Sequence, residues 1–184
     1  MIAYAITDPS TLDFNTFEDD LDYFSKHASM IVYRDKKTIH YAENAKLFLN
    51  YAKGFNKVLL HTDYILAAKL GADGVHLKTT QYKDISKAKE LNLFVVVSTH
   101  TLEEAKEVES LGADMITLSP IFETPNKGKA LGIECLRDII SSVHIPVIAL
   151  GGILTQEQIS SCEGVGAKGF ASIRYFERKL LNSL

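Results

Sequence analysis

The chain has 184 residues, of which 46% are hydrophobic and 23% charged, and its formal net charge is −3. These values are typical of a globular protein; they exclude intrinsic disorder and provide no basic surface for nucleic acid or an anionic membrane. Two cysteines are too few for a disulfide scaffold or a four-cysteine zinc site. No apolar run is long enough to span a membrane, and Asp8 comes too early for a signal peptide. We therefore expect a cytoplasmic protein with one domain over residues 1–184.

Eight short apolar runs predict β-strands. They are continuous rather than alternating, as expected of parallel strands that are covered on both faces. In chain order they are Ile2–Ile6, Met30–Tyr33, Lys57–His61, Gly74–Leu77, Leu93–Ser98, Met115–Ser119, Pro146–Leu150 and Lys168–Ser172. Segments of helical periodicity lie between them, such as Ile39–Lys53 and Leu102–Leu111, and Tyr175–Leu184 is predicted as a final helix.

Three joints before predicted strands share one pattern. Leu70–Asp73, Leu111–Asp114 and Val165–Lys168 each place a glycine where a helix would end and a tight turn would begin. A joint that occurs three times indicates a repeated helix–strand unit. Alternating strands and helices require parallel strands with right-handed crossovers.

Eight such strands predict an α/β fold, a compact single-domain (β/α)₈ TIM barrel. An open doubly wound sheet is the alternative, because these barrels rarely have fewer than about 200 residues. That alternative normally shows a glycine-rich phosphate turn after its first strand. Here the first strand is followed by Thr7-Asp8-Pro9, which favours the barrel.

Active-site groups of such a barrel lie at the carboxyl ends of its strands. Five basic residues are predicted to reach that rim of a net acidic protein: Arg34, Lys36, Lys78, Lys127 and Arg174. A cationic rim fits a phosphorylated or diphosphorylated small substrate, although lysines are also common in loops. Gly151-Gly152 follows the seventh strand, where barrels often bind phosphate; a plain strand-to-helix turn is the other interpretation.

His100 follows the fifth strand and is the best candidate for an acid or base, since histidine titrates near neutral pH. A solvated loop residue or helix start is an equally good interpretation of its position. His61 and His76 lie within predicted strands and are interpreted as core residues. Asp63 could bind magnesium or merely bond the backbone or a lysine, and no second carboxylate is evident, so we assign no metal ligand.

The chain resembles the family that unites thiamin phosphate synthase with the TenI-type thiazole tautomerases, which are (β/α)₈ barrels. The matching segments occur in order over nearly the whole chain. They are Tyr4–Asp8, Tyr33–Lys36, Leu70–Leu77, Ser98–His100, Ser119–Thr124 with Lys127, Leu131-Gly132 and Ile145–Ile153.

The resemblance implies roles for individual residues. In the synthase, which joins an aminopyrimidine diphosphate to a thiazole phosphate and releases pyrophosphate with magnesium, Arg34, Lys36 and Lys127 would contact the pyrophosphate. Gly151, Gly152, Ser172 and Arg174 would hold the thiazole phosphate. In the tautomerase, which shifts a proton on a carboxythiazole phosphate, the acid/base would be His100. The matching segments add four further substrate-binding candidates: Ser98, Thr124, Asn126 and Gly132.

The chain departs from the synthase pattern at the metal site. Synthases usually have Asn-Asp after the third strand, where this chain has Thr62-Asp63. After the fourth strand they have Gly-Gln-x-Asp, whose aspartate binds magnesium. This chain has Lys78-Thr79-Thr80-Gln81 there and lacks that aspartate. Arg174 also stands where the synthases have a serine near the end of the eighth strand. A site with only one of its two carboxylates would bind magnesium poorly and would give little help to the departure of pyrophosphate. The resemblance implies that TenI-like members tolerate the absence of this carboxylate.

We therefore predict a thiazole tautomerase with His100 as acid/base, and with Lys127 or Thr124 stabilising the delocalised anion. A diverged thiamin phosphate synthase, and a non-catalytic protein that binds a phosphorylated ligand, are the alternatives. No cofactor is expected for the tautomerase, whereas Mg²⁺ would accompany the synthase. The partners are then a phosphorylated thiazole and, for a synthase, the aminopyrimidine diphosphate. The sequence is compatible with both a monomer and a homo-oligomer.

Overall fold

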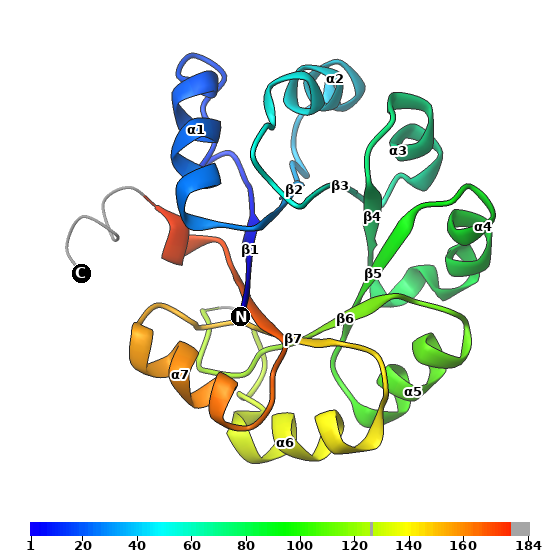
Figure 1. Ribbon diagram of the computed structural model, residues 1–184, viewed down its shortest axis with the longest axis vertical. Helices are drawn as coiled ribbons and strands as arrows, with labels where there is room; N and C mark the ends of the chain where they lie inside the picture. Colours follow the sequence, from blue (N-terminus) through cyan, green and yellow to red (C-terminus); the bar gives the residue numbers. More distant parts are fainter. Residues whose placement is uncertain (126, 178–184) are drawn as a thin grey trace.

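The computed structural model describes residues 1–125 and 127–177 of the chain. Its eight strands are all parallel and close into a barrel in which each strand pairs with its neighbours in chain order (Figure 1). The strands are β1 (Ile2–Ile6), β2 (Met30–Tyr33), β3 (Lys57–His61), β4 (Gly74–Leu77), β5 (Phe94–Thr99), β6 (Met115–Leu118), β7 (Val147–Leu150) and β8 (Gly169–Ser172). The predicted (β/α)₈ barrel is confirmed.

The helices form an outer ring around the strands (Figure 1). They are α1 (Phe17–His27), α2 (Tyr41–Tyr51), α3 (Tyr64–Leu70), α4 (Ile85–Glu90), α5 (Leu102–Ser110), α6 (Gly132–Ser142) and α7 (Gln156–Gly164), with 3₁₀ segments η1 (Thr79–Asp84) and η2 (Arg174–Phe176). The predicted final helix is wrong in its described part, where a 3₁₀ turn follows β8; its remainder, 178–184, lies outside the described residues. Among residues 1–125 and 127–177, no helix has the length and apolar character needed to cross a membrane.

The strands separate two apolar layers. Alternate side chains point into the barrel, where one buried cluster is formed by Tyr4, Ile6, Met30, Val32, Leu59, Val96, Met115, Ile148 and Ala171. Their neighbours, such as Ala5 and Ile31, point outward into a larger cluster between strands and helices. The barrel interior is therefore filled by side chains, and space for a ligand remains only at an end of the barrel.

The repeated joints behave as the sequence predicts. Gly71 and Gly112 take the left-handed backbone with φ of 74° and 90°, which a residue without a Cβ adopts freely. The aspartate two residues later binds back to an earlier strand: Asp73 Oδ2 accepts from Val58 N–H, and Asp114 Oδ2 from Val95 N–H, each at 2.7 Å. These contacts fix where each strand begins, and thus where its carboxyl end presents its side chains.

Candidate active site

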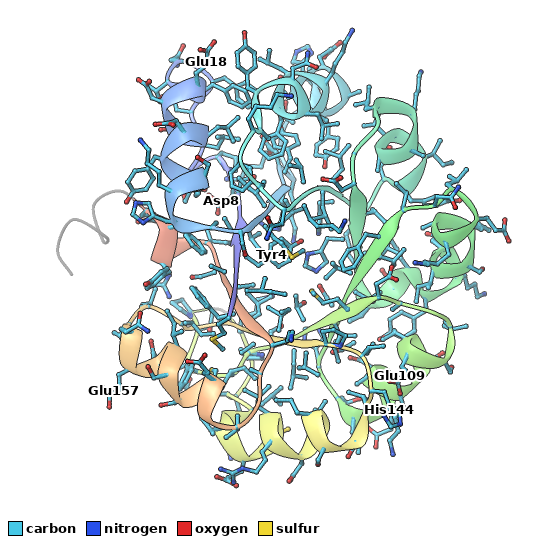
Figure 2. All side chains as sticks on the ribbon, viewed as in Figure 1. Tyr4, Asp8, Glu18, Glu109, His144 and Glu157 are labelled. Atoms are coloured by element: carbon cyan, nitrogen blue, oxygen red, sulfur yellow. The ribbon has the colours of Figure 1, made fainter. Side chains whose placement is uncertain are left out.

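A cavity of about 590 Å³ opens at the carboxyl ends of the strands. Its volume lies within the range of small-molecule sites. Beneath it is the filled interior, where the labelled Tyr4 lies inside the ring of strands, whereas Glu18 lies at the periphery (Figure 2). The structure brings ten of the thirteen predicted site residues to the cavity lining: Arg34, Lys36, Ser98, His100, Thr124, Lys127, Gly151, Gly152, Ser172 and Arg174.

Two predicted substrate-binding residues do not line this cavity, and a third lies outside the described residues. The Asp63 carboxylate caps α3, where Oδ1 accepts from Leu66 N–H at 2.8 Å. Gly132 begins α6 with φ of 81°, and its N–H donates to the Ile121 carbonyl at 3.0 Å, which closes the loop after β6. Both positions therefore have local structural roles. Asn126 is the residue outside the described part of the chain.

Four basic side chains line one part of the cavity: Arg34, Lys36, Lys78 and Lys127, here called the cationic wall. They come from the loops after β2, β4 and β6. The pKa of Lys36 is lowered, chiefly by the Arg34 guanidinium, with burial, Lys127 and Lys78 contributing. Within the described residues, none of the four has a carboxylate oxygen within 4.0 Å. Mutually repelling cations without acidic partners favour the binding of a polyvalent anion.

The loops after β7 and β8 form a second part of the cavity lining: Gly151, Gly152, Ser172 and Arg174, here called the glycine wall. Both glycines have positive φ, 95° and 71°. A Cβ on Gly152 would lie 2.6 Å from the Glu123 carbonyl oxygen, so another side chain cannot fit there. Ser172 Oγ donates to the Ile153 carbonyl at 3.0 Å, which ties the two loops together. Such a turn lets backbone N–H groups approach a phosphate closely.

His100 is oriented by a backbone contact. Its Nδ1 lies 2.7 Å from the Ser119 carbonyl oxygen, which can only accept, so Nδ1 carries the proton in this contact. Nε2 of the neutral ring is then an unprotonated acceptor. The main-chain N–H of His100 donates to Glu104 Oε2 at 2.6 Å, which holds the residue at the start of α5. This arrangement gives the cavity a group that can accept a proton.

Two further histidines form part of the cavity floor. His76 is buried, with its ring nitrogens 2.9 Å from Tyr4 Oη and 3.0 Å from Ser98 Oγ. Burial lowers the pKa of His76 to about 3, with a contribution from Arg34, and lowers the pKa of His61 to about 2, with the His76 ring and nearby cations contributing. Both rings are therefore neutral at neutral pH. The interpretation of His76 as a core residue is confirmed.

The core interpretation of His61 needs correction, since this half-buried residue lines the cavity. Lys78 was expected at the rim but was given no binding role, and His61 and Ser119 were given none; all three line the cavity. The available signal was their position at the end of a strand, where any polar residue of a barrel lies close to the site. Asp8, which follows β1, also lines the cavity and could have been found from the same signal.

The groups after β3 and β4 do not fit a magnesium ion. Gln81 stands where the resembled synthases place a carboxylate, and its Nε2 donates to the Thr62 carbonyl at 3.0 Å and to Asp84 Oδ2 at 3.3 Å. Its Oε1 accepts from Lys78 N–H at 3.3 Å, and the Lys78 side chain lines the cavity beside it. Within 1–125 and 127–177, no group of three or more His, Cys, Asp or Glu side chains could hold a metal. Magnesium prefers carboxylate and water oxygens, which this donor set lacks.

Fold and cavity together define a (β/α)₈ barrel whose cavity, at the carboxyl ends of the strands, is lined by basic side chains and a glycine turn. The family model described as "Thiamine monophosphate synthase" matches residues 3–176. The chain is 37% identical over 179 residues to the putative thiamine-phosphate synthase 2 of Aquifex aeolicus (strain VF5), covering 94% of this chain and 96% of that one. It is 34% identical over 181 residues to the thiamine-phosphate synthase of Caldivirga maquilingensis, covering 92% and 85%.

A solved structure agrees with these sequence relatives. Thiamine phosphate pyrophosphorylase from Pyrococcus furiosus superposes with a TM-score of 0.81 at 27% identity, covering 99% of this chain and 96% of that one. The chain therefore belongs to the thiamine monophosphate synthase family, and the resemblance stated from the sequence is confirmed. The relatives are named as synthases, so the comparisons favour the transferase alternative over the predicted tautomerase.

Proposed function

We propose that this protein is a transferase that joins an aminopyrimidine diphosphate to a thiazole phosphate and releases pyrophosphate. The observation that carries the proposal is the presence of two anion-binding surfaces in one cavity. A synthase has two phosphorylated substrates and needs two such surfaces. A tautomerase acts on one phosphorylated thiazole, for which the glycine wall alone would suffice.

Part of the cationic wall lies across the cavity from part of the glycine wall. Lys78 follows β4 and Arg174 follows β8, and these strands are opposite in a closed ring of eight. A diphosphate on the cationic wall and a monophosphate on the glycine wall would place the two organic parts between them. Holding two reactants in this way converts their encounter into a reaction within one complex.

The cationic wall would assist the step in which the diphosphate departs. The bond between the pyrimidine part and the diphosphate oxygen breaks, its electron pair leaves on that oxygen, and the thiazole supplies the electron pair of the new bond. Arg34, Lys36 and Lys127 would stabilise the charge that develops on the departing diphosphate. The neutral floor of His61 and His76 adds no charge to repel the pyrimidine part.

The direct test supplies both substrates to the purified protein and measures thiamin phosphate by chromatography and pyrophosphate by a coupled assay. We expect the two products to appear in equal amounts, and a Lys36→Ala variant to lose most of the rate. Lys129→Ala removes a lysine of the loop after β6 that does not line the cavity, and it should leave the rate unchanged. No product over a range of magnesium concentrations would refute the transferase.

A second function, the predicted tautomerase, is favoured by one observation, the orientation of His100. Its Nδ1 contact with Ser119 leaves Nε2 as a base at the cavity. A proton shift on a carboxythiazole phosphate should then be lost in His100→Ala, while the product yield of the transfer reaction changes little. If neither reaction occurs but a phosphorylated thiazole binds, the protein is the non-catalytic binder of the third hypothesis.

A further inference from the structure

We propose that the Lys78 ammonium group takes the place of a divalent cation at the diphosphate site, so that this protein binds diphosphate without a metal. The inference rests on the proposed function for its substrate, but its first test needs only inorganic pyrophosphate. It concerns a residue that follows β4 and lines the cavity.

The local structure gives Lys78 a fixed place. Gln81 N–H donates to the Lys78 carbonyl at 3.0 Å, and Lys78 N–H donates to Gln81 Oε1 at 3.3 Å, so the two residues close a turn. The Gln81 amide continues to the Thr62 carbonyl across the neighbouring loop after β3. Gln81 is therefore a positioning residue for Lys78, and its oxygen is already used by the backbone.

The nearby carboxylates are directed to other partners. Asp63 caps α3, and Asp84 accepts from Gln81 and lies 3.8 Å from Lys87 Nζ. Neither lines the cavity, whereas Lys78 does. The side chains that meet a ligand at this point of the rim therefore bring positive charge in place of negative charge.

Charge explains why an added metal ion is unnecessary. Lys78 stands with Arg34, Lys36 and Lys127, and each cation raises the cost of placing a further cation among them. The lowered pKa of Lys36, to which Lys78 contributes, agrees with this repulsion. A diphosphate relieves the repulsion directly, because its oxygens accept charge-assisted hydrogen bonds from these side chains. When the bond to the pyrimidine part breaks, Lys78 neutralises the electron pair that leaves on the diphosphate.

Titration calorimetry with inorganic pyrophosphate tests the binding step. We expect the wild-type affinity in EDTA to lie within about threefold of that in magnesium. Lys78→Ala should weaken binding in EDTA by about 10- to 100-fold, as for the loss of one charge-assisted contact, and Lys78→Arg should retain most of the affinity. Lys83→Ala removes an exposed lysine of η1, the 3₁₀ segment that follows Lys78, outside the cavity lining, and it should bind as the wild type does.

A double variant, Lys78→Gly with Gln81→Asp, restores the residue types of the resembled synthases. Its pyrophosphate affinity should become dependent on magnesium. Thermal melts confirm that each variant is folded. The inference is overturned if the wild type binds pyrophosphate only with magnesium, or if Lys78→Ala binds as tightly as the wild type in EDTA.

The two proposals fail separately. If pyrophosphate binds through Lys78 without metal but the two substrates give no product, the transferase is wrong and the metal-free anion site stands. If product forms only with magnesium and Lys78→Ala does not alter that dependence, the transferase stands and the role of Lys78 is wrong.

Discussion

The cationic wall and the glycine wall both suit phosphate, but they are built in different ways. The cationic wall consists of long side chains from three separate loops, so its binding strength resides in charge. The glycine wall combines one charged side chain, Arg174, with the backbone of two neighbouring turns, which Ser172 joins and of which the Gly151-Gly152 turn is packed against the loop after β6. The first can therefore be altered one charge at a time, whereas a change in the second also affects the fold.

The largest expected effect is at Gly152. Gly152→Ala forces a side chain into a positive-φ position and within 2.6 Å of the Glu123 carbonyl oxygen, so the free energy of unfolding should fall by about 3 kcal/mol. Denaturant unfolding measures this loss, and binding of thiazole phosphate should be lost with it. Gly128→Ala, where a Cβ has open space, is the matched control. Equal stabilities of both variants would show that the glycine wall is not constrained by packing.

Two arginine variants separate the walls by function. Arg34→Ala should weaken pyrophosphate binding by about 10- to 100-fold and leave thiazole phosphate binding nearly unchanged, because charged hydrogen bonds contribute about 1.5–3 kcal/mol each. Arg174→Ala should show the reverse pattern. Calorimetry with each ligand on each variant checks this. If both variants weaken both ligands equally, the cavity has one mixed anion site and the division into two walls is wrong.

The last expected effect depends on pH and concerns the neutral histidines between the walls. Their pKa values in the folded protein, about 2 for His61 and about 3 for His76, lie below the unfolded value of about 6.5. Below pH 6.5 the unfolded chain binds more protons, so stability is fully present above that pH and decreases as pH falls toward 3. Each histidine contributes a slope of at most about 1.4 kcal/mol per pH unit.

Thermal melts between pH 7 and pH 4 measure this dependence. His76→Gln should show a weaker fall in stability with acidification than the wild type. His144→Gln, a change at an exposed histidine, serves as the control and should follow the wild-type curve. An identical pH dependence in His76→Gln would mean that this ring is not the source of the effect.

Much of the fold could be predicted because its signals are local. All eight predicted strands occur, and seven of them have the predicted bounds or differ from the observed bounds by a single residue at one end: β1, β2, β3, β4, β6, β7 and β8. The glycine joints at Gly71 and Gly112 also occur as expected. The final helix after β8 was wrong where it is described, because apolar residues such as Phe176 pack in a 3₁₀ turn as well as in a helix.

The site was predictable only in part. Strand-end position identified Arg34, Lys127 and His100, since a parallel barrel brings all carboxyl ends to one rim. The same rule could not show that Asp63 turns to cap α3. It also could not show that His61 and His76 both reach the cavity floor, or that Tyr4 and Ser98 hold the His76 ring there. Those outcomes depend on side-chain direction.

The amino-acid sequence by itself determined the eight strands, their parallel order and the family, because periodicity, glycine joints and ordered motifs are properties of short segments. Only the tertiary structure decided that Asp63 caps α3, that Gln81 is committed to the backbone, and that no carboxylate of the described residues pairs with the cations of the cavity. The physical reason is that charge and hydrogen-bond partners act across a few ångströms of space, between residues that the chain separates by dozens of positions.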